Sequence, residues 1–118
     1  MSRKLWLFLV VALAALVVTV AAVAAPARQQ ATTVTVTGTE FKFTLSKKVV
    51  PKGTVTFKFM NKGAIAHDFK IAGKKTPTVA AGKSATLKIV FKKAGKYPYL
   101  CTLPSHAPAG MKGVLTVK

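Results

Sequence analysis

The sequence predicts an all-β protein, an antiparallel β-sandwich of about seven to eight short strands, preceded by an N-terminal signal segment. Three observations predict this class. Apolar and polar residues alternate with a period of two, turns containing Gly or Pro separate these runs, and no segment of the domain has a clear helical pattern. Alternation of this kind gives each strand one buried face, and two such sheets bury their apolar faces against each other.

Residues 1–27 have the features of a secretory signal peptide. A basic start is followed by an uncharged apolar run from Leu5 to Ala25, which small residues close. The small-residue pattern fits cleavage after Ala24 or after Ala27. The run is also long enough to span a bilayer, so an uncleaved membrane anchor is the alternative. Either way, the domain of residues 28–118 is expected in the periplasm or at the extracellular face of a membrane.

The domain after position 27 is small and strongly basic. Its 91 residues contain 17 basic and 2 acidic side chains, a formal charge of +15, and they suffice for one domain with a modest core, expected to be a monomer. The lysines fall in turns and at outward strand positions and do not line a helix, so nucleic-acid binding is not predicted. They favour solubility and protect sheet edges, and attraction to an acidic partner is a further expectation.

The expected strands follow one another with turns between them. They cover residues 33–37, 40–45, 54–60, 67–71, 86–91, 96–101 and 114–117. Parity assigns the core-facing positions, which include Phe41, Phe43, Leu45, Val55, Phe57, Phe59, Leu87, Ile89, Phe91, Leu115 and Val117.

Four potential metal ligands are expected to meet at one end of this sandwich. His67 opens its strand on the core-facing side, and Cys101 closes the strand of residues 96–101. If these two strands are antiparallel neighbours, both residues lie at the same pole. The loop that begins at Cys101 and contains His106 and Met111 lies at that pole as well.

Each of these residues has an ordinary structural explanation when taken alone. A buried Cys or Met commonly fills a core, and a single His is more often hydrogen-bonded than a ligand. However, the only Cys of the chain has no intrachain disulfide partner, and an unpaired thiol outside the cytoplasm needs another reason. Two His, one Cys and one Met together are the ligand set of an electron-transfer copper site. The sequence therefore predicts one copper ion held by His67, Cys101, His106 and Met111.

The loop resembles that of the small blue copper proteins, the cupredoxins. Four residues separate Cys101 from His106, as in azurin, and four separate His106 from Met111, as in plastocyanin. The resemblance covers the whole domain after the leader. It implies a Greek-key cupredoxin β-sandwich, a type 1 copper site that shuttles one electron between Cu(I) and Cu(II), and a redox protein as partner.

The resemblance also implies residues that surround the ligands. The family usually has Asn after the upstream His, and this chain has Asp68, whose backbone N–H is expected to point at the sulfur. Its carboxylate is expected to accept a hydrogen bond from Thr102 and to favour Cu(II). The N–H of Leu103 is expected to give the sulfur a second hydrogen bond, with the opposite effect on the reduction potential.

Other copper and zinc chemistries need residues that this chain does not have. A multicopper oxidase needs many histidines, a binuclear copper carrier needs two cysteines, and a zinc hydrolase needs a carboxylate base at an open site. The chain has two His, one Cys and only Glu40 and Asp68 as acids, so no enzymatic activity is predicted. An extracytoplasmic copper chaperone or scavenger is the alternative function.

Overall fold

The fold is described from a computed structural model of the chain, for residues 14–21 and 31–118. Residues 14–21, which belong to the predicted leader, contain neither helix nor strand. The expected cleavage sites after Ala24 and Ala27 lie outside the described residues. Within the described part of the chain, no helix has the length and apolar character needed to cross a membrane.

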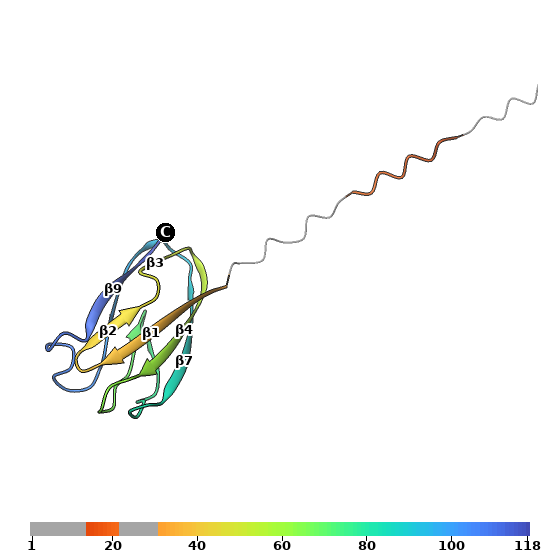
Figure 1. Cartoon of the computed structure of the whole chain (residues 1–118). Coiled ribbons are helices and arrows are strands. Elements are labelled where there is room, and N and C mark those ends of the chain that lie inside the picture. Colours follow the sequence, from red (N-terminus) through yellow and green to blue (C-terminus); the bar gives the residue numbers. More distant parts are fainter. Residues whose placement is uncertain (1–13, 22–30) are drawn as a thin grey trace, which may run out of the picture.

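The domain is built from two β-sheets that face each other (Figure 1). The first has the strand order β2-β1-β4-β7 and the second the order β3-β9-β8-β5-β6. The strands are β1 (Thr32–Thr39), β2 (Lys42–Leu45), β3 (Val49–Val50), β4 (Gly53–Asn61), β5 (Lys70–Ile71), β6 (Lys74–Lys75), β7 (Ser84–Phe91), β8 (Gly95–Leu100) and β9 (Lys112–Val117). The predicted all-β sandwich is confirmed.

The sheets contain both strand directions. Strand β1 pairs with β4 in parallel, and β3 pairs with β9 in parallel, whereas the other paired strands are antiparallel. Side-chain alternation is the same in parallel and antiparallel strands, so the sequence pattern could not reveal these two pairings.

The core lies between the sheets and is rich in aromatic side chains. The alternation in β1 and β4 buries every second residue, as predicted. Phe43 contacts Phe69 edge to face with ring centroids 5.4 Å apart, and Tyr99 with centroids 5.9 Å apart. Edge-to-face contacts add to the stabilisation that burial of these rings supplies. The loops at one pole of the sandwich extend from the strands that form this core.

The prediction that Phe41 faces the core is wrong. Strand β2 begins at Lys42, and the register pairs Thr39 with Lys42, so Glu40 and Phe41 form a two-residue hairpin turn. Alternation ends where pairing ends, and Phe41 is 38% exposed. Its ring instead lies edge-on to two histidine rings, those of His106 and His67.

The strand predicted for residues 67–71 is shorter than expected. Only Lys70–Ile71 form β5, and His67 makes an isolated antiparallel bridge with Val79 through two backbone hydrogen bonds. The expected antiparallel neighbourhood is nevertheless present, because β5 pairs with β8. Strands β3 and β6 were not predicted, since two residues are too few to show alternation.

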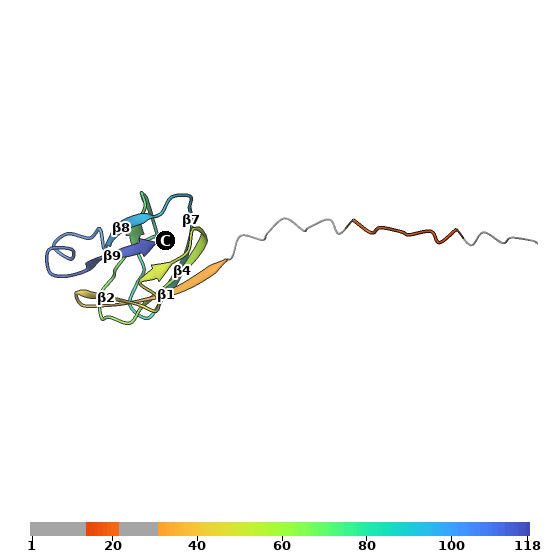
Figure 2. The ribbon, with the colours of Figure 1, turned by 90° about the horizontal axis from the view of Figure 1, so that it is seen from above.

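One pole of the sandwich collects the ends of several strands. The β1–β2 turn and the long loop between β8 and β9 lie together at the left in Figure 2, far from the start of β1. We call this end the loop pole. Its position follows from the topology, since β1 and β4 run in parallel toward it and β8 ends there while β9 begins.

Candidate metal centre

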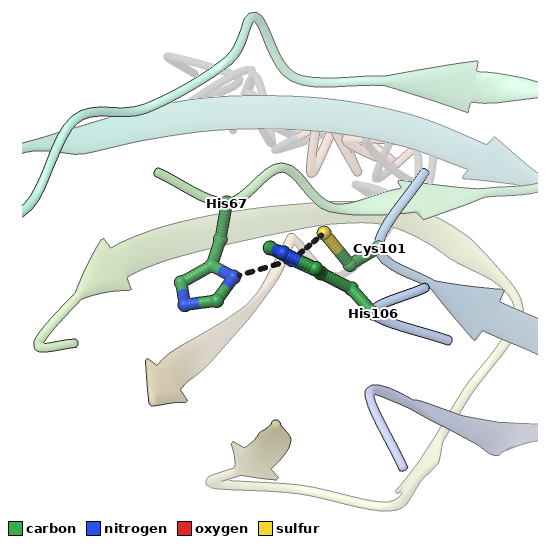
Figure 3. A group of neighbouring side chains, drawn as sticks. All are labelled: His67, Cys101 and His106. Atoms are coloured by element: carbon green, nitrogen blue, oxygen red, sulfur yellow. Dashed lines mark hydrogen bonds between the residues drawn. The ribbon is translucent and has the colours of Figure 1, made fainter. Parts of the chain in front are cut away.

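Three predicted ligands lie together at the loop pole. The donor atoms of His67, Cys101 and His106 all lie within 4.8 Å of one another. Nδ1 of His106 lies 3.1 Å from Nδ1 of His67 and 3.4 Å from Sγ of Cys101, so its ring stands between the other two (Figure 3). The exposed fractions are 0% for His67, 1% for Cys101 and 9% for His106. We call these residues the His–Cys–His cluster.

Backbone hydrogen bonds hold closed the loop of residues 101–111 between β8 and β9, which we call the ligand loop. The N–H of Cys101 donates to the carbonyl of Met111 over 3.0 Å, and the N–H of Met111 donates to the carbonyl of His106 over 3.1 Å. A further bond runs from the N–H of His106 to the carbonyl of Leu103 over 3.2 Å. Ser105 has a φ of 68°, a conformation that non-Gly residues adopt rarely and that turns the chain just before His106. The loop is therefore a defined structure in which Cys101 and His106 keep fixed places.

Met111 lies beside the cluster in sequence and in space. Its side chain is fully buried, and its backbone is bonded to both Cys101 and His106. Copper sites with two His and one Cys commonly have a Met as a weak fourth ligand. Burial and the two backbone bonds hold Met111 at the cluster.

The sulfur of Cys101 is in a dry environment with backbone donors near it. Burial raises the pKa of the thiol, while the backbone N–H groups of Asp68 and Leu103 act in the opposite direction. The N–H of Asp68 points at Sγ over 3.5 Å. A buried thiol flanked by two imidazoles suits a soft metal ion, which takes the place of the proton on the sulfur. The residues present therefore fit copper.

Asp68 ties the strand of His67 to the ligand loop. Its Oδ1 accepts the backbone N–H of Thr102 over 2.6 Å, and its Oδ2 accepts the hydroxyl of Thr102. This is the hydrogen bond expected from the sequence. The exposed ammonium of Lys75 lies 3.7 Å from Oδ2, so the buried carboxylate has a partial counter-charge.

Glu40 is a neighbour of the cluster that the sequence reasoning missed. Its Oε1 lies 3.2 Å from Nε2 of His67 and accepts the backbone N–H groups of Ala64 over 2.7 Å and of Ile65 over 3.0 Å. The hydrogen bond from Ile65, helped by that from Ala64, lowers the pKa of Glu40 to about 2. The only feature of the sequence that could have drawn attention to Glu40 is the scarcity of acidic residues, because the chain has two acidic residues and 19 basic ones.

The surface above His106 is apolar. Phe41 lies edge-on to the ring of His106, with centroids 5.0 Å apart, and its carbonyl would be only 2.9 Å from a Cβ at Gly110. Pro108 and Ala109 of the loop are exposed, and Ala107 is half-buried. We call Phe41, Ala107, Pro108 and Ala109 the apolar rim. The sequence pattern had predicted that Phe41 would lie in the core.

The chain is similar to known proteins in both sequence and structure. The family model for the cupredoxin-like domain matches residues 9–117. The chain belongs to the cupredoxin-like family. Auracyanin from the photosynthetic bacterium Roseiflexus castenholzii is 27% identical, with a TM-score of 0.66, over 74% of this chain and 97% of that one. This cupredoxin also resembles auracyanin A, a "blue" copper protein of Chloroflexus aurantiacus, with 22% identity and a TM-score of 0.66. The match covers 75% of this chain and 100% of auracyanin A.

A multicopper enzyme shares the fold over part of its length. The blue copper oxidase of Nitrosomonas europaea is 18% identical with a TM-score of 0.63, and the match covers 75% of this chain but 39% of the oxidase. No curated protein sequence matches this cupredoxin significantly. Family membership and the His–Cys–His cluster together describe a protein able to bind one copper ion as in type 1 sites, consistent with an electron carrier.

Proposed function

We propose that this cupredoxin is an exported one-electron carrier whose type 1 copper ion is held by His67, Cys101, His106 and Met111. The observation that carries the proposal is the buried His–Cys–His cluster, with its donor atoms within 4.8 Å of one another. Bound there, copper supplies a one-electron couple between Cu(I) and Cu(II).

The protein's part is to hold the ligands in nearly the same place in both oxidation states. The ligand loop is bonded to itself through Cys101, His106 and Met111, and Asp68 binds its start. A ligand set that moves little when the charge changes lets the electron transfer with little rearrangement. We assign Asp68, Thr102 and Leu103 to this support, with the N–H groups of Asp68 and Leu103 directed at the sulfur.

Export is proposed from the leader, residues 1–27, and from the position of the loop pole. Strand β1 begins at the end of the sandwich far from the loop pole (Figure 2). A chain still attached to a membrane through its N-terminal segment would therefore hold the His–Cys–His cluster away from the attachment point. Both a cleaved, periplasmic form and an anchored form are compatible with access of a partner to His106.

Copper delivery is the competing function, and a stopped-flow experiment separates it from electron transfer. Ligands that exchange copper are expected to be open, whereas those of the His–Cys–His cluster are at most 9% exposed. We expect the Cu(II) protein to be reduced and reoxidised repeatedly by a soluble redox protein without losing metal to a chelator. Transfer of copper to the chelator during cycling would instead identify a chaperone or scavenger.

The proposed partner is an acidic redox protein that docks on the apolar rim. Residues 31–118 contain 16 lysines, while the only two acids of the chain, Glu40 and Asp68, are both engaged at the loop pole. Long-range attraction by such a charge raises the rate of encounter, and the small rim suits a transient contact of little buried area. His106, the most exposed member of the cluster, lies under this rim.

Electron transfer to an acidic partner is therefore expected to slow as salt rises from ~10 to ~300 mM, since the Debye length falls from about 30 Å to below 10 Å.

Ala107→Glu is expected to slow transfer even at high salt without changing the visible spectrum, because it places a negative charge in the apolar rim. Ala94→Glu, at an exposed position before β8, is the matched control. Salt-independent rates would contradict the steering, and equal rates for the two variants at high salt would contradict the docking site.

A further inference from the structure

We propose that Glu40 is a positioning residue that fixes the orientation and tautomer of His67, so that Nδ1 of that ring faces the metal position. The inference rests on the proposed copper site. It adds a carboxylate, supplied by the β1–β2 turn, to the residues that define the site.

The geometry assigns opposite tasks to the two ring nitrogens of His67. Nε2 lies 3.2 Å from Oε1 of Glu40, and Nδ1 faces Nδ1 of His106 over 3.1 Å. A carboxylate only accepts hydrogen bonds, so Nε2 carries the hydrogen and donates it. The lone pair of the neutral ring is then on Nδ1, inside the His–Cys–His cluster. Ligating histidines commonly donate their second N–H to such an acceptor, which orients the ring and raises its basicity.

The chain holds the carboxylate of Glu40 in a prepared site. Oε1 accepts the backbone N–H groups of Ala64 and Ile65 in addition to the ring of His67. The carboxylate lies directly over Gly63, where an added Cβ would be 2.3 Å from Oε1 and 2.8 Å from Oε2. The backbone of Gly63 is outside the left-handed region, so a side chain at this position would act by displacing the carboxylate.

These contacts join two segments that are distant in sequence. The β1–β2 turn brings Glu40 to the segment 63–67, and the next residue of the turn, Phe41, covers His106. One turn thus orients the first histidine through Glu40 and shields the second through Phe41. Because the carboxylate is negative, it also stabilises the more highly charged Cu(II) form relative to Cu(I).

The first test uses the metal-free protein and ¹⁵N NMR of the histidine rings at a pH where they are neutral. In the wild type we expect His67 to be the Nε2–H tautomer. Glu40→Gln keeps an oxygen that accepts the same three hydrogen bonds, so we expect it to keep that tautomer. Glu40→Ala is expected to give a mixture of tautomers. An unchanged Nε2–H tautomer in Glu40→Ala would overturn the proposal.

The second test measures Cu(II) and Cu(I) affinity and the reduction potential of the loaded protein. We expect Glu40→Ala to lose Cu(II) affinity by roughly 10–100-fold, as for other changes next to metal ligands. Glu40→Gln is expected to retain most of the affinity and to raise the potential, because it removes only the charge. Each tenfold by which the affinity for Cu(II) falls more than the affinity for Cu(I) corresponds to a rise of about 59 mV in the reduction potential. Ala94→Lys, far from the loop pole, is the control for a net charge change of +1.

A double-mutant cycle tests whether a substitution at Gly63 affects His67 through the carboxylate of Glu40. Gly63→Ala pushes the carboxylate away from its site and is expected to weaken Cu(II) binding and mix the tautomers, as Glu40→Ala does. In a Glu40→Ala background the same change is expected to have no further effect, because there is nothing left to displace. Equal effects of Gly63→Ala in both backgrounds would contradict a role through Glu40.

The two proposals fail in different ways. If the wild type bound no copper, the proposed function would be wrong, and the tautomer experiment on the metal-free protein would still decide whether Glu40 orients His67. If the wild type formed the copper site and Glu40→Ala matched Ala94→Lys in tautomer, affinity and potential, the positioning role would be wrong while the proposed function stood.

Discussion

Cys101→Ser is expected to leave the β-sandwich folded and to abolish the intense visible absorption of the Cu(II)-loaded protein. That absorption arises from charge transfer from a thiolate sulfur to Cu(II), and Cys101 is the only cysteine of the chain. A hydroxyl oxygen does not provide this transition. Absorption spectra of the wild type and the variant, each titrated with Cu(II), measure the effect.

The variant is expected to fold because the change is small and polar groups lie near the new hydroxyl. The side chain of Cys101 is 1% exposed, with the N–H of Asp68 and Nδ1 of His106 near the sulfur. Leaving a buried hydroxyl incompletely bonded costs about 1–3 kcal/mol, which thermal unfolding of the metal-free proteins measures. Pro108→Ala, exposed in the same loop, is the control and is expected to keep the full band. A wild type that binds Cu(II) and stays colourless would contradict the type 1 assignment.

His67→Ala is expected to destroy the copper site, whereas Met111→Leu is expected to preserve it. His67 is fully buried and supplies one of the two imidazoles of the cluster, and no third histidine exists to replace it. We expect Cu(II) affinity to fall by more than the roughly 10–100-fold typical of changes outside the ligand shell, with loss of the blue band. Competition with a chelator of known affinity measures the loss.

Met111→Leu is the matched variant for this comparison, because it also removes a proposed ligand from a fully buried position. A weak axial thioether contributes little to holding the metal, so the blue band is expected to remain. Its removal destabilises Cu(II) more than Cu(I), and the reduction potential is expected to rise. A potential equal to that of the wild type would mean that Met111 only packs, and equal damage from both variants would contradict the assignment of His67 as the stronger ligand.

The two acidic residues of this cupredoxin both lie at the loop pole and form hydrogen bonds there. Asp68 accepts hydrogen bonds from Thr102 and has Lys75 as a partial counter-charge, while Glu40 meets the ring of His67. Both carboxylates are expected to oppose reduction of a bound Cu(II), and the two backbone N–H groups near the sulfur are expected to favour it. Substitution at Glu40 and at Asp68 therefore offers two separate means of changing the potential.

Much of this protein was determined by the sequence alone. Alternation with a period of two predicts strands whatever their partners, because it reports only which side chains face the core. The same parity turns His67 inward at the start of its segment and Cys101 at the end of another. The spacing from Cys101 through His106 to Met111 then resembles a family ligand loop without any knowledge of how the sheets pair.

Only the tertiary structure decided what lies next to that loop. The parallel pairing of β1 with β4 carries the β1–β2 turn to the loop pole, and the Thr39–Lys42 register makes Glu40 and Phe41 the turn itself. Parity placed Phe41 in the core because alternation continues in the sequence after pairing has ended. The contact of Glu40 with His67 joins residues 27 positions apart. Such a contact depends on strand pairing and on the space above Gly63, and neither leaves a periodic signal in the sequence.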